Sequence, residues 1–384
     1  MTQRPRVAIV FGGTSHEHGI SCLTAASVTR AIDPERYEVI GVGITPSGEW
    51  VVMPGHEVAE LKVNGRRMPE VAAPRRATAP DAVVIDPAAD SGERDHTAVA
   101  GLHPGQTASV VHLPDLDGVD VAFSMLHGPF GEDGTIQGLF EMLGIRYVGS
   151  GVFASAAGMD KHYMKLLMAG AGVPVGPYVV ITAREWERDP NACLDAVEAL
   201  QYPVFVKPAR AGSSFGINRV ASSAHLSQAI EFAHQYDPKV IVEQGFVGAR
   251  ELECGVLEKP TGPEASVVAE IRASTESGFY DFEAKYLPGE DVQADVPAAI
   301  PDEVAGEVRS LSVKVFEALG CEGLARVDFF WTPQGQLYCN EINTMPGFTA
   351  QSMYPRLWAE SGLDYPSLVD VLVQQGLQRP LGLR

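Results

Sequence analysis

Acidic, amide and basic side chains gather late in the chain, in the stretch RVDFFWTPQGQLYCNEIN (326–343). Side chains alternate between the two faces of a strand, so Arg326 and Asp328 share one face. After the PQG turn, Glu341 and Asn343 share a face of the returning strand. Burying such groups unpaired is costly, and hard cations prefer oxygen ligands. The pattern predicts a site for Mg²⁺ or Mn²⁺ with phosphate as the other ligand, and a ladder of salt bridges is the alternative.

A second stretch, VKPARAGSSFGI (206–217), combines a lysine with small, hydroxyl-bearing residues. Lys207 closes a predicted strand, and Ser213 and Ser214 lie in the glycine-rich turn that follows. Free backbone N–H groups and hydroxyls, with a lysine as point charge, are typical of a phosphate cradle. The Walker A spacing is absent, so the pattern favours a hairpin lid over phosphate. A glycine-rich turn without a ligand is the alternative.

Two further glycine-rich segments each follow an apolar run of strand length. In FGGTSHEHGIS (11–21), Glu17 falls at the start of a predicted helix, where it either favours the helix dipole or accepts a substrate ammonium. In HGPFGEDGTIQG (127–138), glycines let the backbone approach a ligand at the carboxyl end of a sheet strand. We expect the acidic pair Glu132 and Asp133 to brace this loop rather than take part in chemistry.

The elements that must position these groups follow two patterns. Near the N-terminus, RVAIVFGG (6–13), a helix over 14–32 and YEVIGVGIT (37–45) form a strand–helix–strand unit, which predicts a doubly wound sheet. Later, YPVFVKPARAGSSFGINRV (202–220) has the pattern of a hairpin, and RELECGVLE and ASVVAEI (250–271) alternate as antiparallel sheet. The predicted fold class is therefore α/β in the first part and α+β in the second.

The bulk composition disfavours several classes of function. The chain of 384 residues has 29 Lys and Arg against 49 Asp and Glu, a formal net charge of −20, which disfavours nucleic acid and anionic membranes as partners. Its cysteines are scattered without a CxxC pair, and no run reaches the ~18 apolar residues of a membrane span, so we expect a cytoplasmic location. Segment 54–105, rich in Pro, Ala, Gly and charge, is predicted to be a peripheral insertion or a mobile excursion.

These motifs together resemble one family. FGGTSHEHGIS, HGPFGEDGTIQG, GSSFGI, FYDFEAKY and NEINTMPGFTAQSMYP follow one another in the order of the D-alanine–D-alanine ligase family of ATP-grasp ligases, and MDK (159–161) fits as well. The resemblance runs from about Val7 to Pro355, and five motifs in order are far more specific than any one. It implies an ATP-grasp fold behind an N-terminal Rossmann-like (pre-ATP-grasp) domain, with domains at 1–158, 159–246 and 247–384.

The same resemblance implies a reaction. A member of this family joins two D-alanine molecules through an acyl phosphate, for peptidoglycan precursor synthesis, with ATP and two Mg²⁺ or Mn²⁺ ions, and works as a homodimer. The alternatives are a ligase that joins D-alanine to D-lactate, another carboxylate–amine ATP-grasp ligase, and a nucleotide-binding regulatory protein without turnover. The intact set of Arg326, Asp328, Glu341 and Asn343 argues against the last of these.

At the substrate end, the resemblance assigns roles to single residues. Glu17 matches the residue that holds the ammonium of the first D-alanine, and Ser213 and Tyr286 match the pair that hydrogen-bonds with it. His127 matches a residue near the acyl phosphate, and Lys285 matches the lysine near the γ-phosphate and the substrate carboxylate. In the family, tyrosine at the position of Tyr286 goes with D-alanine as the second substrate, and phenylalanine goes with D-lactate.

At the nucleotide end, the resemblance assigns a second group. Lys161 and Lys207 match the lysines on the ATP phosphates, and Ser214 belongs to the same phosphate loop. Glu243 and Glu251 match the acids that face adenine and ribose.

The metal and acceptor groups complete the implied site. Asp328, Glu341 and Asn343 match the ligands of two Mg²⁺ ions, with Glu341 bridging them. Arg326 and the backbone N–H of Gly347 match the donors to the oxyanion.

The clamp on the second carboxylate is matched by Ser352 and Met353.

Two positions depart from the family pattern. Gln244 stands where many members have lysine. The glutamine side chain can still form a hydrogen bond with the purine edge, but it lacks the positive charge of lysine. Phe282 replaces a commoner tyrosine in FYDFEAKY, with little expected consequence.

Overall fold

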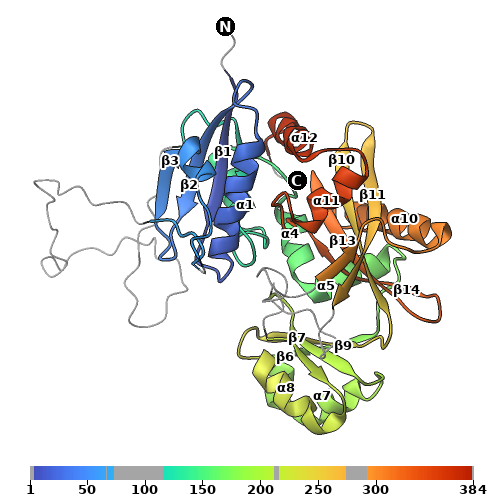
Figure 1. Cartoon of the computed structure of the whole chain (residues 1–384). Coiled ribbons are helices and arrows are strands. Elements are labelled where there is room, and N and C mark those ends of the chain that lie inside the picture. The colour runs from blue at the N-terminus through green and yellow to red at the C-terminus, as the bar shows by residue number, and fades with distance from the viewer. Residues whose placement is uncertain (1–3, 66, 73–115, 212–215, 274–291, 383–384) are drawn as a thin grey trace, which may run out of the picture.

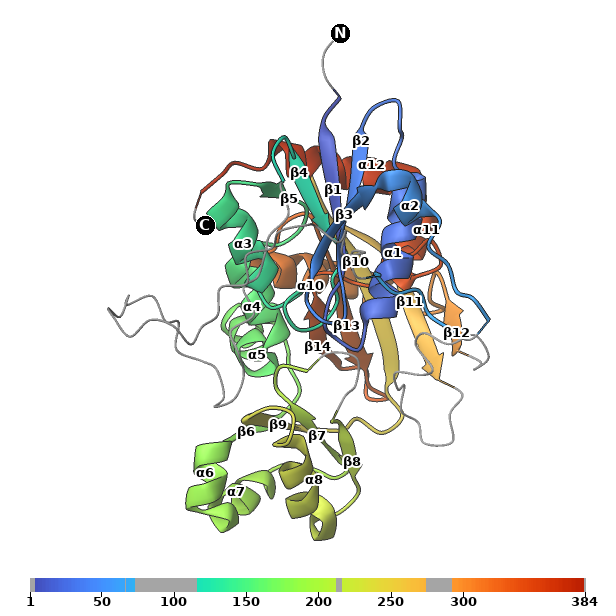
Figure 2. The ribbon, with the colours of Figure 1, turned by 90° about the vertical axis from the view of Figure 1, so that its left-hand side faces the viewer.

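The structure is a computed structural model that describes residues 4–65, 67–72, 116–211, 216–273 and 292–382. In these residues the strands form three sheets. Figures 1 and 2 show the first and third sheets together in the upper body, while the second sheet and its helices lie below them. The motif FYDFEAKY and four predicted site residues lie outside the described residues. These four are Ser213, Ser214, Lys285 and Tyr286.

The first sheet has the order β3-β2-β1-β4-β5. Its strands are β1 (Arg6–Gly12), β2 (Glu38–Ile44), β3 (Trp50–Pro54), β4 (Val121–Ser124) and β5 (Arg146–Tyr147). β1 pairs in parallel with β2 and β4, whereas β3 is antiparallel to β2. Helix α1 (His18–Ala31) connects β1 to β2, so the predicted strand–helix–strand unit is confirmed. The continuous apolar run of β1 suits a strand that is buried on both faces.

The segment predicted to be peripheral from residue 54 onward begins inside this domain. Helix α2 (Gly55–Ala59) follows β3 and packs against α1 and β2. Val58 is fully buried and shares the core with Phe11 and Val71. The prediction is therefore wrong for α2, because a single apolar residue per helical turn is enough to anchor a short helix. Residues 73–105 lie outside the described residues.

The second sheet is antiparallel, with the order β6-β9-β7-β8. Its strands are β6 (Tyr178–Thr182), β7 (Val204–Pro208), β8 (Asn218–Val220) and β9 (Lys239–Gln244). It is covered by α6 (Ala183–Arg188), α7 (Pro190–Val197), η1 (Ser223–His225) and α8 (Leu226–Ala233). Valines that alternate along β7 face a core with α7 and α8. The hairpin predicted for 202–220 is confirmed as β7 and β8.

The third sheet is also antiparallel, with the order β12-β11-β10-β13-β14. Its strands are β10 (Arg250–Lys259), β11 (Gly262–Ala273), β12 (Val292–Asp295), β13 (Leu324–Trp331) and β14 (Leu337–Asn343). Around it lie α4 (Val152–Met159), α5 (Lys161–Gly170), α10 (Asp302–Ala318) and α11 (Met353–Glu360). Helix α10 packs on β10, β11 and β13, and both α4 and α5 pack on β14. The predicted antiparallel sheet of the later region is thereby confirmed.

The C-terminal helix returns to the first sheet. Helix α12 (Tyr365–Gln378) packs on β4, and Leu372 lies in one core cluster with Val7. The hydroxyl of Tyr37 donates a hydrogen bond of 2.6 Å to Asp370, which ties the two ends of the chain together. The first and third sheets therefore share a core. The division at 158 and 246 stays a prediction.

Candidate functional site

A pocket of about 670 Å³ opens where the three sheets approach one another. Every predicted site residue that the structure describes lines this pocket. They are Glu17, His127, Lys161, Lys207, Glu243, Glu251, Arg326, Asp328, Glu341, Asn343, Gly347, Ser352 and Met353. The fold thus gathers residues from both ends of the chain, although their individual roles stay predictions.

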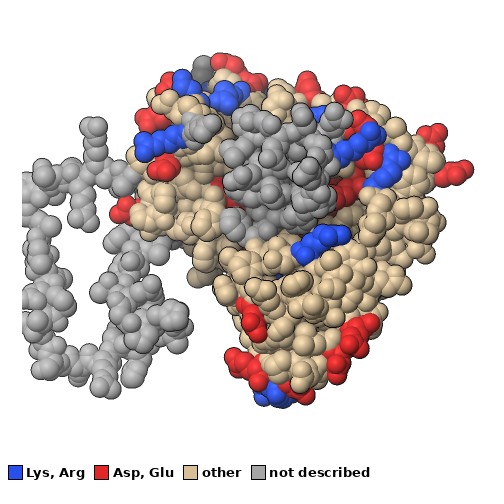
Figure 3. Space-filling model, turned by 60° about the horizontal axis from the view of Figure 1, so that its bottom comes forward, with Lys and Arg blue, Asp and Glu red and all other residues tan. Residues whose placement is uncertain are grey.

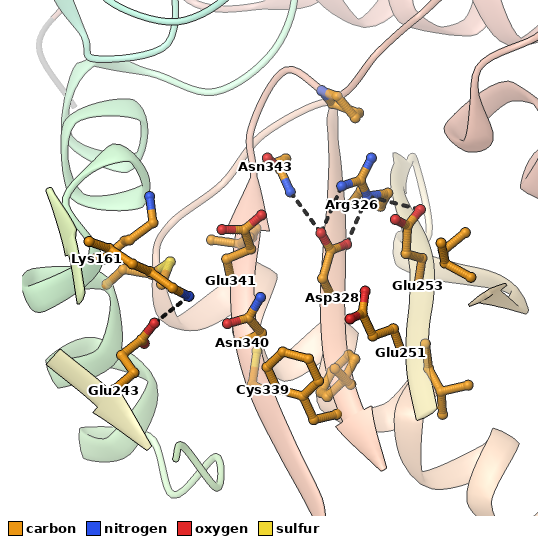
Figure 4. Close-up of a pocket in the computed structure, with 18 of the residues that line it drawn as sticks. Lys161, Glu243, Glu251, Glu253, Arg326, Asp328, Cys339, Asn340, Glu341 and Asn343 are labelled. Carbon is orange, nitrogen blue, oxygen red and sulfur yellow. Dashed lines mark hydrogen bonds and ion pairs between the residues drawn. The ribbon is translucent and has the colours of Figure 1, made fainter. Parts of the chain in front are cut away.

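Strands β13 and β14 carry the acidic part of the pocket (Figure 4). Asp328 pairs in register with Glu341, so the two carboxylates stand beside each other on neighbouring strands. Arg326 pairs with Asn343 in the same way. The alternation of side chains puts the two residues of each strand on one face, as the period of two predicts. A β-bulge between Asp328 and Phe329 shifts the register by one residue, and this shift sets the two pairs opposite each other.

Arg326 neutralises two of the carboxylates around it. Its Nε and one terminal nitrogen each donate to Asp328 at 2.7 Å, and its Nε lies 3.2 Å from Glu253 on β10. Burial lowers the pKa of the guanidinium, but the Asp328 and Glu253 carboxylates more than offset this and hold it well above its usual range. Arg326 stays charged and fixed in place.

The oxygen donors of this face suit a hard cation. Within the described ranges, no group of three or more His, Cys, Asp or Glu side chains is arranged as a metal site. The donor set is instead two carboxylates and one amide, and the amide nitrogen of Asn343 donates 3.2 Å to Asp328. Arg326 supplies the positive charge beside these carboxylates. Oxygen-only donors of this kind fit Mg²⁺ or Mn²⁺, with phosphate oxygens as the remaining ligands.

The basic part of the pocket is supplied by α5 and β7. The N-cap residue Asp160 accepts hydrogen bonds from the backbone N–H groups of His162 and Tyr163, so α5 begins at Lys161. The Lys161 ammonium donates 3.0 Å to the carbonyl oxygen of Ala211, and burial lowers its pKa. Lys207 stands on β7, and its ammonium lies 2.5 Å from Glu243. Two predicted phosphate lysines thus face the pocket from different elements.

Glu243 on β9 lies between two lysines. Its Oε1 is 2.7 Å from the ammonium of Lys165, and its Oε2 contacts Lys207. Burial raises the pKa of Glu243, but the two ammonium groups outweigh it and bring the pKa to about 2. Its neighbour Gln244 accepts a hydrogen bond of 3.1 Å from the backbone N–H of Gln201 and also lines the pocket.

Glu17 and His127 line the pocket from the segments that follow β1 and β4. Glu17 is buried at the N-cap of α1, and its side chain makes no capping hydrogen bond. Gly128 has φ +71°, and a Cβ there would stand 2.5 Å from a carboxylate oxygen of Glu17. The glycine thus allows the loop after β4 to lie against Glu17. Burial lowers the pKa of His127, so its imidazole is neutral near pH 7.

The acidic pair in this loop braces it, as predicted. The backbone N–H of Gly128 donates 2.6 Å to Glu132, and Asp133 accepts from the N–H groups of Phe130 and Thr135 at 2.9 and 3.0 Å. Burial and the nearby Glu17 carboxylate raise the pKa of Glu132 to about 8. Glu132 also lines the pocket, so it is a protonatable group beside Glu17.

Replacing Glu132 by glutamine is expected to stabilise the protein increasingly as pH rises. The folded pKa of Glu132 lies above its usual 4.5, so its favourable contribution is complete below about pH 4.5 and is lost as pH rises through about 8. Each pKa unit corresponds to about 1.4 kcal/mol, so a difference on the order of a few kcal/mol is expected by pH 9. Melting temperatures of both proteins without metal from pH 5 to 9 check this, and a pH-independent difference would contradict it.

The segment before α11 forms a further part of the pocket wall. Ser352 is the N-cap residue of α11, which begins at Met353. The Ser352 hydroxyl accepts from the backbone N–H of Thr349 at 3.1 Å, and a Cβ at Gly347 would stand 3.3 Å from it. Glycine at 347 therefore keeps a backbone segment close to the serine hydroxyl and open to the pocket.

Sequence reasoning missed four charged residues that line the pocket, namely Lys165, Arg219, Glu253 and Arg356. Lys165 follows Lys161 by one helical turn, a spacing that places both on one face of α5 and could have indicated it. Glu253 lies opposite Asp328 in the pairing of β10 with β13. Only the strand order brings it there, so the sequence carries no local signal for it.

The fold combines an α/β sheet, which has a loop site at the carboxyl end of its strands, with two antiparallel sheets. The pocket between them holds lysines and paired carboxylates. These features define the ATP-grasp class of ligases, and the predicted fold class is confirmed. Sequence profiles described as the D-ala D-ala ligase N-terminus and C-terminus match residues 6–150 and 167–374. The chain belongs to the D-alanine–D-alanine ligase family.

Similar proteins match along their whole length. The chain is 51 % identical to a protein named D-alanine–D-alanine ligase from Kineococcus radiotolerans, over 99 % of both chains. It is 49 % identical to the protein of the same name from Mycobacterium avium, over 100 % of this chain and 99 % of the other. A solved D-Ala:D-Ser ligase, VanG from Enterococcus faecalis, has a TM-score of 0.75 at 32 % identity and covers 97 % of this chain and all of its own.

The surface agrees with the acidic composition. On the face drawn in Figure 3, lysine and arginine side chains of the described residues lie in small groups with acidic side chains beside them. None of the helices in the part of the chain that the structure describes is long and apolar enough to cross a membrane.

Proposed function

We propose that this chain joins two D-alanine molecules to D-alanyl-D-alanine at the expense of ATP, for peptidoglycan precursor synthesis. The observation that carries this proposal is the pocket of about 670 Å³ on which every described predicted residue converges. A carboxylate oxygen of the first D-alanine attacks the γ-phosphorus of ATP, and ADP leaves. The amine of the second D-alanine, having lost a proton, attacks the acyl phosphate carbonyl, and the tetrahedral oxyanion collapses with loss of phosphate.

The chain's own residues account for the charges that this reaction develops. Glu17 holds the first ammonium, and Lys161 and Lys207 hold the phosphates of ATP. Arg326, fixed by its carboxylate partners, and the backbone N–H of Gly347 stabilise the oxyanion. The neutral imidazole of His127 adds no second positive charge beside Glu17.

Asp328, Glu341 and Asn343 would hold two divalent cations, Mg²⁺ or Mn²⁺, with Glu341 shared between them. Bound there, the ions would neutralise the charge of the transferring phosphoryl group. Glu243 and Glu251 face adenine and ribose in this arrangement. Ser352 and the start of α11 at Met353 hold the carboxylate of the second D-alanine.

The decisive experiment is ATP turnover with single substrates. ADP release is measured with D-alanine alone and with D-alanine plus D-lactate or D-serine, and the products are weighed by mass spectrometry. Dipeptide as the main product near neutral pH supports the proposal. No ADP release with D-alanine would overturn it, and a mixed product would favour an acceptor like that in the name of the solved VanG relative.

Replacing Tyr286 by phenylalanine is expected to add D-alanyl-D-lactate synthesis. In the resemblance, the tyrosine hydroxyl joins Ser213 and Glu17 in a hydrogen-bonded chain, and a site built on that chain favours an attacking amine. Tyr286 and Ser213 lie outside the described residues. With D-alanine and D-lactate supplied together at neutral pH, the product ratio tests this, and an unchanged ratio would show that Tyr286 has no part in acceptor choice.

Two further parts of the proposal concern the protein's state. A cytoplasmic location is supported by five cysteines that are all free and buried. A homodimer is supported by an apolar patch on α4 and α5, where Phe153, Tyr163 and Leu166 are about half exposed around one hollow.

Replacing Phe153 by glutamate is expected to turn the dimer into a monomer. A charge in the middle of the apolar patch would have to be desolvated when two copies meet. Light scattering at several protein concentrations measures the mass. Phe232→Glu, at an exposed phenylalanine on α8, is the matched control and should leave the mass unchanged. A monomeric wild-type protein, or a dimer that survives Phe153→Glu, would contradict this use of the patch.

A further inference from the structure

Lys165 is a charged residue of the pocket to which the proposed reaction gives no role. Its side chain is only 3 % exposed. Its ammonium lies 2.7 Å from Oε1 of Glu243 and donates 3.0 Å to the carbonyl oxygen of Asn340. Burying an ammonium is costly unless it is paired and hydrogen-bonded, so these two contacts offset its burial and hold it in position.

These contacts join two different layers of the fold. Glu243 stands on β9 of the second sheet, and Asn340 stands on β14 of the third. Lys165 lies on α5, which packs on β14. The other partner of Glu243, Lys207, stands on β7, the direct neighbour of β9 within the second sheet. Lys165 is thus the partner that fixes the position of Glu243 relative to the third sheet, which carries Asp328, Glu341 and Asn343.

Glu243 keeps room for a further donor. An ionised carboxylate is an acceptor only and offers about four lone-pair positions, and the two lysines engage one oxygen each. In the proposed function Lys207 turns to a phosphate of ATP. Lys165 then remains as the buried cation that keeps Glu243 charged and in place.

We propose that Lys165 is a positioning residue for purine recognition: it holds Glu243 as an ionised acceptor for the 6-amino group of adenine, and the enzyme thereby discriminates ATP from 6-oxo purine nucleotides. A 6-oxo group carries no proton and would face a carboxylate with its own lone pairs, which is repulsive. This role rests on the proposed function, because that function places adenine at Glu243.

The charged and titratable groups that face Glu243 come from three elements. They are Lys161 and Lys165 on α5, Lys207 on β7 and Tyr178 on β6. Removing Lys165 leaves a buried carboxylate with one direct cation fewer, so its pKa must rise. In Lys165→Met the affinity for adenine nucleotides should therefore fall as the solution becomes acidic, whereas the wild-type affinity should change little.

The test compares ADP with IDP, which differ at the 6-position, by calorimetric titration of the whole protein with Mg²⁺ and without D-alanine. We expect wild type to bind ADP more tightly than IDP. In Lys165→Met that ratio should fall about tenfold or more, and the weakening of ADP binding should grow from pH 8 to pH 5.5. The matching KM for ATP should rise while kcat changes less, since Lys165 acts through the purine.

Two variants separate this role from a merely structural one. Lys165→Arg keeps the charge and should restore most of the discrimination. Lys314→Met is the matched control, since Lys314 is an exposed lysine on α10 that also donates to a backbone carbonyl, and it should leave the ratio unchanged.

Three outcomes decide the question. A lower melting temperature in Lys165→Met with an unchanged ADP/IDP ratio would overturn the role of Lys165. If Lys165→Met does not fold, Glu243→Gln takes its place, because its amide can turn an N–H toward a 6-oxo group, and an unchanged ratio there overturns the role as well. Tight, selective ADP binding without any D-alanine-dependent ADP release would instead refute the proposed function and leave the purine site standing.

Discussion

Glu341→Gln is expected to reduce D-alanine-dependent ADP release by at least about 100-fold while the protein stays folded. Glu341 stands directly opposite Asp328 in the pairing of β13 with β14. Glutamine keeps the shape but removes one negative charge from a donor set that has only two carboxylates. A factor of 100 corresponds to about 2.7 kcal/mol of transition-state stabilisation, within the several kcal/mol that charge neutralisation by a metal ion supplies.

Manganese binding gives this prediction a readout that is independent of turnover. Titration with Mn²⁺ in the presence of ADP should show weaker binding by Glu341→Gln than by wild type. Glu264→Gln is the control, because Glu264 is an exposed carboxylate on β11 that pairs only with neighbours outside the pocket. Near-normal ADP release by folded Glu341→Gln would contradict the metal site. The side chains of Arg326, Asp328, Glu341 and Asn343 would then form a ladder of salt bridges.

The acidic face could be predicted from sequence because its geometry is local. A hairpin brings its two strands side by side, and the alternation of side chains puts the two charged or amide groups of each strand on one face. The β-bulge that sets Asp328 opposite Glu341 was not predicted. The same holds for the loop at 127–138, where Glu132 and Asp133 bond to backbone groups within four residues. In such segments each side chain contacts groups that lie only a few residues away or on the neighbouring strand of the same hairpin.

The missed contacts depend instead on how distant elements pack. Lys165 meets Glu243 and Asn340 only because α5 lies between the second sheet and β14. Helix α2 has the composition of a loop and is held by Val58 in a core that residues from both ends of the chain complete. A pattern in a single segment shows which face is apolar or charged, but it does not show which distant segment covers that face.

Arg326→Met is expected to abolish most turnover while nucleotide binding persists. Arg326 is the proposed side-chain donor to the oxyanion, and removing one such donor typically costs a factor of about 100 to 1000 in kcat. The same change leaves Asp328 and Glu253 beside each other without the cation that now lies against both. The phosphates of ATP are held by Lys161 and Lys207, so ADP affinity should change much less than kcat.

The nature of the substitution sets the size of the effect. Arg326→Lys keeps a positive charge but cannot donate to both oxygens of Asp328 at once, so its kcat should lie between those of wild type and Arg326→Met. Arg309→Met is the control, since Arg309 on α10 donates to a carbonyl outside the pocket. If Arg326→Met kept more than about a tenth of wild-type kcat, the oxyanion would have to be stabilised mainly by backbone N–H groups such as that of Gly347. If it lost ADP binding as well, Arg326 would act chiefly by holding Asp328 and Glu253 in place.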